Sequence, residues 1–191
     1  GVHAAAVPNT ETPMVAAIDD AETQVFVVEA SSFRLAHVHH FSASPSAWLN
    51  FSPDHLDVHA DLKSYEAAKA RIWEGVDSAA DAVANLADPV VAAHAPVGAT
   101  GFGRFDSFCR IHGGRLLHGD NEVIDVASMP RRLPHDLLNA QAATAVAVRC
   151  GADLDSCAAV LTDFRGLAHR MNLIAEHDGI RYVDDSKATT P

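Results

Sequence analysis

Long hydrophobic runs, paired cysteines and an excess of positive charge are all missing from this sequence of 191 residues. No apolar stretch approaches the roughly 20 residues that a membrane span needs. The opening GVHAAAVPNTETP has no basic segment of the kind that begins a signal peptide. The three cysteines form no C-x-x-C pair, which argues against a disulfide framework or a thiolate zinc site. We therefore expect reduced thiols and a cytoplasmic protein.

Positive charge is scarce, because 14 basic residues stand against 25 acidic ones and the net charge is −11. A basic stripe that would bind nucleic acid is therefore absent, and no nucleic-acid partner is expected. A P-loop is absent as well, since G-x-x-x-x-G-K-S/T occurs nowhere in the sequence. The glycine-rich stretch 98–103 has no lysine in the required place, and it predicts only a turn.

The apolar residues, 48% of the total, suffice for one full core. Continuous apolar runs at 25–28, 47–51 and 82–85 are typical of strands buried on both faces of a parallel sheet. A helical pattern over 63–74 lies between the second and third runs. This spacing fits a right-handed β-α-β crossover and predicts an α/β fold, in which helices flank a parallel sheet.

The second half of the sequence has a different pattern, with shorter strands and longer helices. Two glycines at 113–114 suggest antiparallel pairing, and Gly151 is suited to end a helix. Asp178 and Gly179 predict a hairpin turn, and we place a domain boundary near Gly166. The predicted strands are 108–111, 115–117, 123–126, 171–176 and 180–183, and the predicted helices are 136–149 and 155–161.

Candidate chemistry follows the first two predicted strands. Glu29 stands where parallel sheets bind ligands, at the carboxyl end of a strand, and serine hydroxyls follow it at 31–32. The segment 54–59 (DHLDVH) places two acids and two imidazoles after the next strand, and such groups suit Mg²⁺. From the residues alone, a solvated acid and a polar surface loop remain open as alternatives.

Lys69 is the most informative single residue. It lies four residues from both Tyr65 and Trp73 on the predicted helix, and therefore shares their apolar face. A lysine stem lying along the edge of that stripe is one interpretation. The other is a functional lysine, because burial favours the neutral amine and makes it chemically available.

Five segments in order resemble the Mur ligase family, in particular its D-glutamate-adding branch. Segment 29–35 (EASSFRL) is similar to the family's E-L-S-S-F-Q-L, and 50–57 (NFSPDHLD) to N-x-x-x-D-H-x-D. Segment 65–72 (YEAAKARI) resembles Y-x-A-A-K-x-R-I. The last two, 164–170 (FRGLAHR) and 185–189 (DSKAT), resemble F-x-G-L-x-H-R and D-S-K-A-T.

The resemblance implies ATP- and Mg²⁺-dependent addition of D-glutamate to UDP-N-acetylmuramoyl-L-alanine through an acyl phosphate. It implies a central ATPase domain over 1–166 that lacks its P-loop, and the start of a C-terminal Rossmann-like domain over 167–191. On this basis we expect a monomer, truncated at both ends, whose 191 residues alone neither ligate nor bind ATP tightly. Another Mur ligase, a metal-dependent hydrolase built on Asp54, His55, Asp57 and His59, and a non-catalytic nucleotide-binding remnant are the alternatives.

The resemblance also implies roles for individual residues. Glu29, His55 and a carbamylated Lys69 would be the catalytic residues and would hold Mg²⁺, while Asn9 and Ser31 would contact the nucleotide-sugar substrate. ATP would be bound by the set Asn139, Arg170, Asp185, Lys187 and Thr189. This sequence departs from the family at four positions: 8–11 (PNTE) lacks both glycines of a G-N-I-G turn, Arg34 replaces Gln, Asp136 stands where Asn is usual, and Thr190 replaces Asn.

Overall fold

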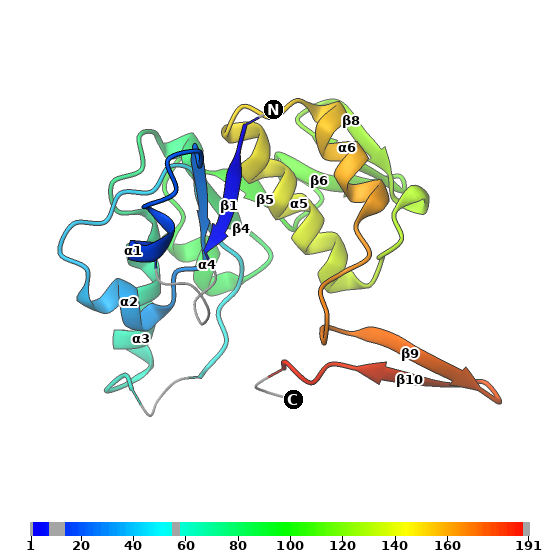
Figure 1. Ribbon diagram of the computed structural model, residues 1–191. Coiled ribbons are helices and arrows are strands. Elements are labelled where there is room, and N and C mark those ends of the chain that lie inside the picture. Colours follow the sequence, from blue (N-terminus) through cyan, green and yellow to red (C-terminus); the bar gives the residue numbers. More distant parts are fainter. Residues whose placement is uncertain (1, 8–13, 55–57, 189–191) are drawn as a thin grey trace. The chain divides into compact units, whose positions relative to one another are not determined.

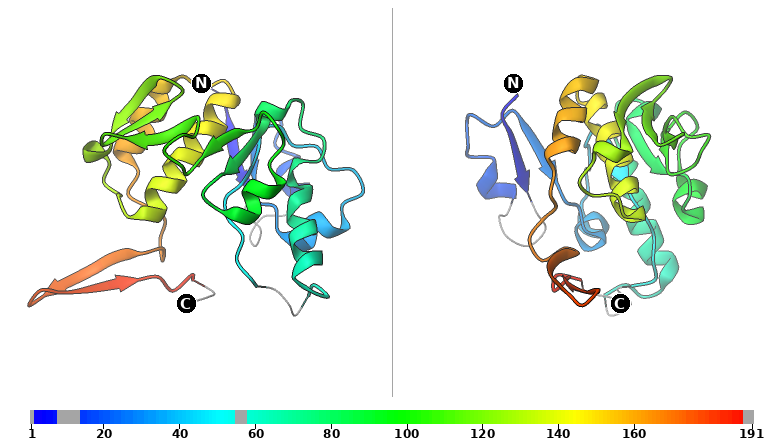
Figure 2. Two further views of the ribbon diagram at one scale, coloured as in Figure 1. Left: turned by 180° about the vertical axis from the view of Figure 1, so that it is seen from behind. Right: turned by 90° about the vertical axis from the view of Figure 1, so that its right-hand side faces the viewer.

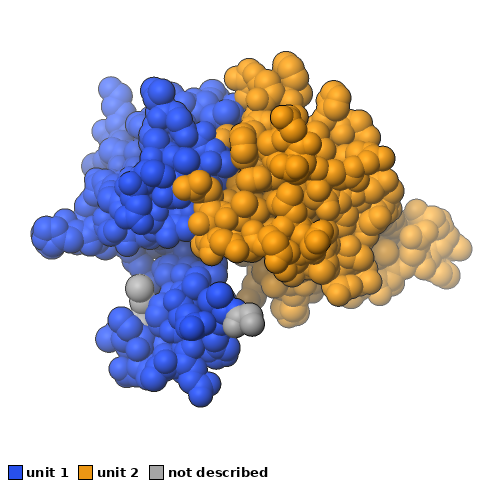
Figure 3. Space-filling model, turned by 90° about the horizontal axis from the view of Figure 1, so that it is seen from above, with its two compact units in different colours: residues 1–100 blue, residues 101–191 orange. Residues whose placement is uncertain are grey.

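The structure, a computed structural model, describes residues 2–7, 14–54 and 58–188. The chain divides into two compact units, residues 1–100 and 101–191, which Figure 3 distinguishes by colour. The two units are defined by compactness and divide at residue 100. The domain boundary expected near Gly166 stays a prediction. No helix among the described residues has the length and apolar character that crossing a bilayer requires.

The first unit contains two pairs of parallel strands with helices between them (Figure 1). Strand β1 pairs with β2, and β3 pairs with β4. Parallel pairing of β3 with β4 is the arrangement that the predicted β-α-β crossover requires. The elements in chain order are β1 (Ala4–Val7), α1 (Met14–Ala17), β2 (Val25–Val28), α2 (Ser32–His37), β3 (Ser46–Trp48), α3 (Leu62–Ala70), η1 (Arg71–Trp73), η2 (Ala79–Asp81), β4 (Ala82–Asn85) and α4 (Pro89–His94).

Strand β2 corrects one expectation. Its bounds, Val25–Val28, are those predicted, but Val27 is 60% exposed and Val28 is 39% exposed. Consecutive residues of a strand face opposite sides, so neither face of β2 is covered at this end. The apolar run therefore predicted the strand correctly, but the prediction that the strand is buried on both faces was wrong. Strand β4, in contrast, is buried at every position, as predicted.

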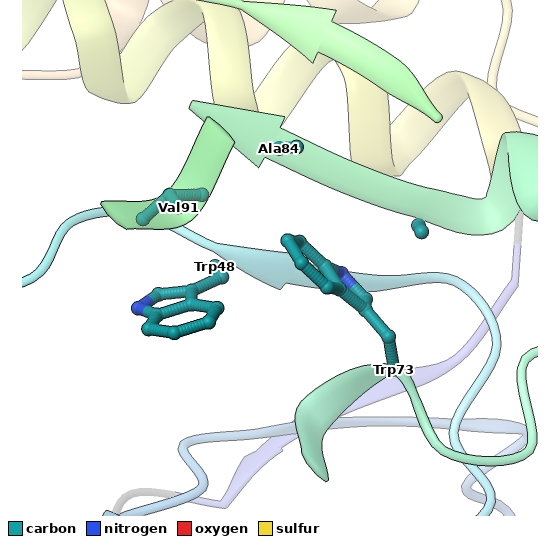
Figure 4. Close-up of a cluster of buried hydrophobic side chains, with 5 residues drawn as sticks. Trp48, Trp73, Ala84 and Val91 are labelled. Atoms are coloured by element: carbon teal, nitrogen blue, oxygen red, sulfur yellow. The ribbon is translucent and has the colours of Figure 1, made fainter. Parts of the chain in front are cut away.

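The core of the first unit forms where β3, β4, η1 and α4 meet (Figure 4). Trp48 of β3 and Trp73 of η1 pack with their ring centroids 5.6 Å apart, and Val91 of α4 closes the cluster beside them. Ser46 Oγ donates to the Ile72 carbonyl at 2.8 Å, which fixes η1 against the start of β3. The tryptophans thus join the crossover helix to the strand that precedes it.

The loop after β3 forms hydrogen bonds with Asn85, at the end of β4, and with Asp88, which caps α4. The predicted strand 47–51 ends instead at Trp48, because the following backbone groups bond to side chains. Asn85 Nδ2 donates to the Leu49 carbonyl at 2.8 Å, and the Phe51 N–H donates to Asp88 Oδ2 at 2.7 Å. Asp88 also caps α4 through the Val90 and Val91 N–H groups. These bonds fix the chain that leads into the segment 54–59.

Replacing Asn85 with alanine should destabilise the first unit by about 1–3 kcal/mol. Asn85 is 5% exposed, and its amide satisfies both the Leu49 carbonyl and the Ala87 N–H. Its removal breaks both of these part-buried hydrogen bonds, each of which contributes about 0.5–1.5 kcal/mol. Chemical denaturation followed by tryptophan fluorescence measures the change, since both tryptophans belong to this unit. An unchanged midpoint would show that the loop is held by other means.

The second unit consists of short strands covered by two helices. Strand β6 is parallel to β5 and antiparallel to β7, which pairs with β8. Helix α5 packs on β6 and β7, and α6 packs on β8 (Figure 2). The elements are β5 (Thr100–Phe102), β6 (Cys109–His112), β7 (Arg115–His118), β8 (Asn121–Asp125), η3 (Val126–Ser128), α5 (Pro134–Arg149), α6 (Leu154–Asp163), β9 (Asn172–His177) and β10 (Ile180–Asp184). The α/β fold class and the predicted antiparallel part are confirmed.

Strands β9 and β10 form the predicted hairpin, which extends from the end of α6 as a separate ribbon (Figures 1 and 2). Nearly every side chain on both of its faces is exposed, including Ile174 and Tyr182. The hairpin therefore lacks the burial that normally stabilises two strands in water.

We expect amides of 172–184 in the 191-residue chain to exchange with solvent far faster than those of α5. Local opening of an uncovered hairpin costs little free energy, whereas α5 packs on two strands. Hydrogen exchange followed by NMR or mass spectrometry makes the comparison within one sample. Protection of the hairpin equal to that of α5 would contradict the prediction.

Candidate functional site

Glu29 lies directly after β2, at the carboxyl end of a parallel pair. Its N–H donates to the Val7 carbonyl at 3.1 Å, which extends the pairing of β1 with β2 by one residue. Its side chain is exposed. Two residues later, Ser31 caps α2, and its Oγ accepts from the Arg34 N–H at 3.4 Å. The carboxylate and the hydroxyls thus follow the strand end, as predicted from the sequence.

The described part of the segment 54–59 contributes a buried histidine. His59 is 9% exposed, and its Nε2 lies 2.9 Å from Oγ of Ser32, which is 3% exposed. The imidazole stacks on Phe33 with centroids 5.7 Å apart and packs on Tyr65 at 5.1 Å. His59 is therefore a hydrogen-bonded core residue that joins the loop before α3 to the first turn of α2.

Lys69 lies above Tyr65 on α3, with Nζ 5.5 Å from the ring centroid. The helix begins at Asp61, which forms a capping box with Ser64. Tyr65 is buried, and burial, with a smaller contribution from the charge of Asp54, raises the pKa of its phenol. Burial also lowers the pKa of the Lys69 amine, because desolvation disfavours the ammonium form. This agrees with the prediction that the face of Lys69 is apolar.

Arg71, in the helical turn that follows α3, contacts the other end of α2. Its guanidinium donates to the Leu35 carbonyl, and its second terminal nitrogen donates to the Val38 carbonyl at 2.5 Å. These carbonyls belong to the last turn of α2 and the residue after it. Helix α2 has six residues, so its ends need such partners. Residues flanking α3 therefore contact α2 at both of its ends.

The hydrolase alternative loses support at this place. Within residues 2–7, 14–54 and 58–188, no three His, Cys, Asp or Glu side chains are gathered so as to hold a metal ion. The His59 imidazole bonds to Ser32 and stacks on Phe33, so it has a structural role rather than that of a metal ligand. His55 and Asp57 lie outside the described residues, as do Asn9 and Thr189 of the predicted substrate and nucleotide sets.

Three predicted ATP-binding residues lie together in the second unit, at the base of the hairpin. The Met171 N–H donates to Asp185 Oδ1 at 3.2 Å, and the Lys187 N–H donates to the His169 carbonyl at 3.2 Å. Arg170 lies between these two contacts. The segment 169–171 is thus fastened to 185–187, which brings Arg170, Asp185 and Lys187 into one loop pair.

Asp136 is engaged structurally at the start of α5. Its Oδ1 accepts from Arg131 Nε at 2.8 Å, and its Oδ2 accepts from the Leu133 N–H at 3.1 Å. The Arg131 guanidinium also reaches the Arg170 carbonyl at 3.4 Å. Asn139 is exposed one turn further along α5. Asn139 is therefore the more accessible of the two positions, while Asp136 ties α5 to the hairpin base through Arg131.

Sequence reasoning identified neither the bond between His59 and Ser32 nor the role of Arg131. His59 was visible only as one of two histidines in a polar segment, and the residue that it contacts is 27 positions away. Arg131 precedes a predicted helix without belonging to any motif. An acidic residue at the third position of that helix was the one available signal of a cap.

Parallel strands, crossover helices and motif-bearing loops define an α/β domain of the kind found in Mur ligases. The chain belongs to the Mur ligase family, because residues 9–107, more than half of it, match the Mur ligase middle domain. The solved MurF of Acinetobacter baumannii has the same fold, with a TM-score of 0.69 at 18% identity over 94% of this chain and 44% of that one. MurC of Thermotoga maritima aligns with a TM-score of 0.61 at 20% identity, covering 84% of this chain and 38% of its own.

Curated relatives cover almost the whole chain. The UDP-N-acetylmuramoylalanine–D-glutamate ligase of Methylococcus capsulatus is 39% identical over 99% of this chain and 42% of its own length. The enzyme of the same name from Pelotomaculum thermopropionicum is 35% identical over 96% of this chain and 43% of its own. The chain thus spans about two fifths of the length of these relatives.

Proposed function

We propose that this chain is part of an ATP-dependent ligase that adds D-glutamate to UDP-N-acetylmuramoyl-L-alanine, a step of peptidoglycan synthesis and hence of bacterial cell-wall formation. The observation that carries the proposal is the similarity of nearly the whole chain to ligases of that name, at 39% identity for the Methylococcus capsulatus enzyme. A placement of Lys69 that favours the neutral amine supports it. We further propose a cytoplasmic monomer.

The proposed reaction has two balanced steps. The alanyl carboxylate of the nucleotide-sugar takes the γ-phosphoryl group of ATP, which yields an acyl phosphate and ADP. The amine of D-glutamate then attacks the acyl carbon, an amide bond forms, phosphate leaves, and the amine proton passes to solvent. Such chemistry depends mainly on positioning and on neutralising phosphate charge.

Within the first unit, Glu29, His55 and Lys69 would hold Mg²⁺. When bound, the ion supplies positive charge that neutralises phosphate oxygens. The fit is supported by the exposed Glu29 carboxylate at a strand end and by the environment of Lys69. A carbamate forms from the neutral amine and CO₂, so lowering the pKa of Lys69 favours that modification, which would provide another oxygen ligand. Ser31, with Asn9, would contact the nucleotide-sugar.

Within the second unit, Asn139, Arg170, Asp185 and Lys187, with Thr189, would bind ATP. Arg170 and Lys187 are exposed cations on one loop pair, which suits them to phosphate oxygens. The Asp185 carboxylate accepts a hydrogen bond from the Met171 N–H and is half-buried, so it would bind ATP from a fixed position. The exposed amide of Asn139 offers both a donor and an acceptor to an adenine edge.

Phosphate release by the full-length gene product tests the function. We expect release that requires ATP, Mg²⁺, UDP-N-acetylmuramoyl-L-alanine and D-glutamate together, and a product one glutamate heavier by mass spectrometry. L-Glutamate and meso-diaminopimelate are the matched alternative amines. Preference for either of them would assign the chain to another branch of the family, and hydrolysis without any amine acceptor would refute the ligase proposal.

A further inference from the structure

Among the contacts that no motif explains, those of His59 connect the two described parts of the proposed metal site. On one side its Nε2 bonds to Ser32, which follows the substrate residue Ser31 and lies three residues after Glu29. On the other side its ring packs on Tyr65, above which Lys69 lies. A chain of direct contacts therefore runs from the first turn of α2 to the Lys69 side chain.

Burial makes these contacts specific. Ser32 and Tyr65 are each less than 5% exposed, so neither can exchange its partner freely with water. Phe33 also stacks on the imidazole, with the two rings inclined by only 20°. The imidazole thus packs on two aromatic rings, and its Nε2 lies at hydrogen-bond distance from the Ser32 hydroxyl.

The opposite end of α2 is held separately, since Arg71 donates to the carbonyls of Leu35 and Val38. That contact holds the last turn of the helix and lies away from its first turn. A six-residue helix has little stiffness of its own. The bond from His59 to Ser32 supplies the second point that orients α2.

We propose that His59 is a positioning residue, which fixes the Ser31–Ser32 turn through its bond to Ser32 and fixes the Lys69 side chain through its packing on Tyr65. The inference rests on the proposed ligase function for its effect on turnover. Its structural part is independent of that function, because it concerns two contacts within the first unit. In this proposal His59 acts through Ser32 and Tyr65.

Two variants of His59 separate the two contacts. His59→Phe keeps an aromatic ring against Tyr65 and loses the bond to Ser32. His59→Gln keeps a group able to bond to Ser32 and loses the ring. Ser32→Ala removes the hydroxyl alone, and His112→Gln alters an exposed histidine of β6 as the matched control.

In the full-length gene product, His59→Phe and Ser32→Ala should each lower kcat by about 10- to 100-fold, the usual effect of removing an orienting partner of a metal site. KM for ATP should change little. The double variant should be no worse than either single variant, because both remove the same bond. His112→Gln should behave as wild type. Wild-type kcat in His59→Phe, or additive losses in the double variant, would overturn the proposal.

The packing on Tyr65 has its own readout in the 191-residue chain. The chain contains three lysines, so lysine labelled with ¹³C at Cε gives three correlations by NMR. The ring current of Tyr65 should shift the Lys69 signal, and the shift should persist in His59→Phe and diminish in His59→Gln. If wild type fails to use D-glutamate, the proposed function is wrong while this measurement still decides the role of His59. An unchanged Lys69 signal in folded His59→Gln would overturn that role.

Discussion

Lys69→Met is expected to lower kcat for D-glutamate addition by about 10³-fold or more while leaving the fold at least as stable as wild type. Methionine fills a similar volume against Tyr65 but accepts no CO₂ and provides no oxygen ligand. A bound metal ion contributes several kcal/mol of charge stabilisation to a phosphoryl-transfer transition state, and each 1.4 kcal/mol or so corresponds to about a tenfold change in rate. Steady-state kinetics of the full-length gene product measure the loss.

The folded state of Lys69→Met should be more stable than that of wild type, although its kcat is lower. The reason is that burial lowers the pKa of Lys69 in the folded state. Below that folded pKa the ammonium form is present in both states, and its desolvation disfavours the fold. Between the folded pKa and the unfolded value of about 10.4, the unfolded state binds more protons, so wild-type stability rises with pH. The Met variant has no such group, and its advantage in Tm should be largest near neutral pH and should shrink as pH approaches about 10.4.

Lys63→Met is the matched control, because Lys63 is an exposed lysine on the same helix. It should change neither kcat nor the dependence of Tm on pH. Near-wild-type turnover in Lys69→Met would exclude a carbamate at this position. Equal loss of turnover and of stability would instead identify Lys69 as a packing residue whose removal disturbs α3.

The elements that the sequence predicted best are those with local causes. Strand β4 follows a continuous apolar run, helices α5 and α6 follow helical patterns, and the turn at 178–179 contains its own conformational preference. Helices α2 and α4 were not predicted, because each has six residues and depends on caps. Those caps are formed by Ser31 and Asp88, which look like ordinary polar residues until the partners are known.

The site shows the same limit. The positions of Glu29 and Lys69 followed from strand ends and helical spacing, which are local properties. The bond from His59 to Ser32 joins two loops, and it depends on the packing of α2 against α3. Likewise, the exposure of β2 depends on what packs against its faces rather than on its own residues. Contacts between distant segments therefore account for most of what the sequence alone did not predict.

Arg131→Ala is expected to destabilise the second unit by about 3–5 kcal/mol. The Arg131 and Asp136 side chains are 16% and 10% exposed, and their ion pair spans 2.8 Å. Removing the guanidinium leaves a largely buried carboxylate with only the half-exposed His135 imidazole, 3.4 Å away, as a basic neighbour among the described residues, which is far more costly than losing a surface pair. Gly166 packs on the same guanidinium with φ of 105°, and a Cβ there would lie 2.5 Å from it. The substitution should therefore also release the segment 166–170 that leads into the hairpin.

Chemical denaturation of the 191-residue chain, followed by circular dichroism, measures the loss, and hydrogen exchange of α5 assigns it to the second unit. Asp136→Asn should cost less than Arg131→Ala, because the asparagine oxygen can still accept from the Leu133 N–H or from Arg131, and the Arg131 guanidinium keeps its contact with the Arg170 carbonyl. The double variant should recover part of the loss, because asparagine carries no charge to be left unpaired. Arg132→Ala, which alters the exposed neighbouring arginine, should be nearly neutral. A cost for Arg131→Ala below about 1 kcal/mol would mean that the pair behaves as a solvated surface contact, and that the hairpin base is held by its other contacts, such as those of Asp185 with Met171 and of His169 with Asp184.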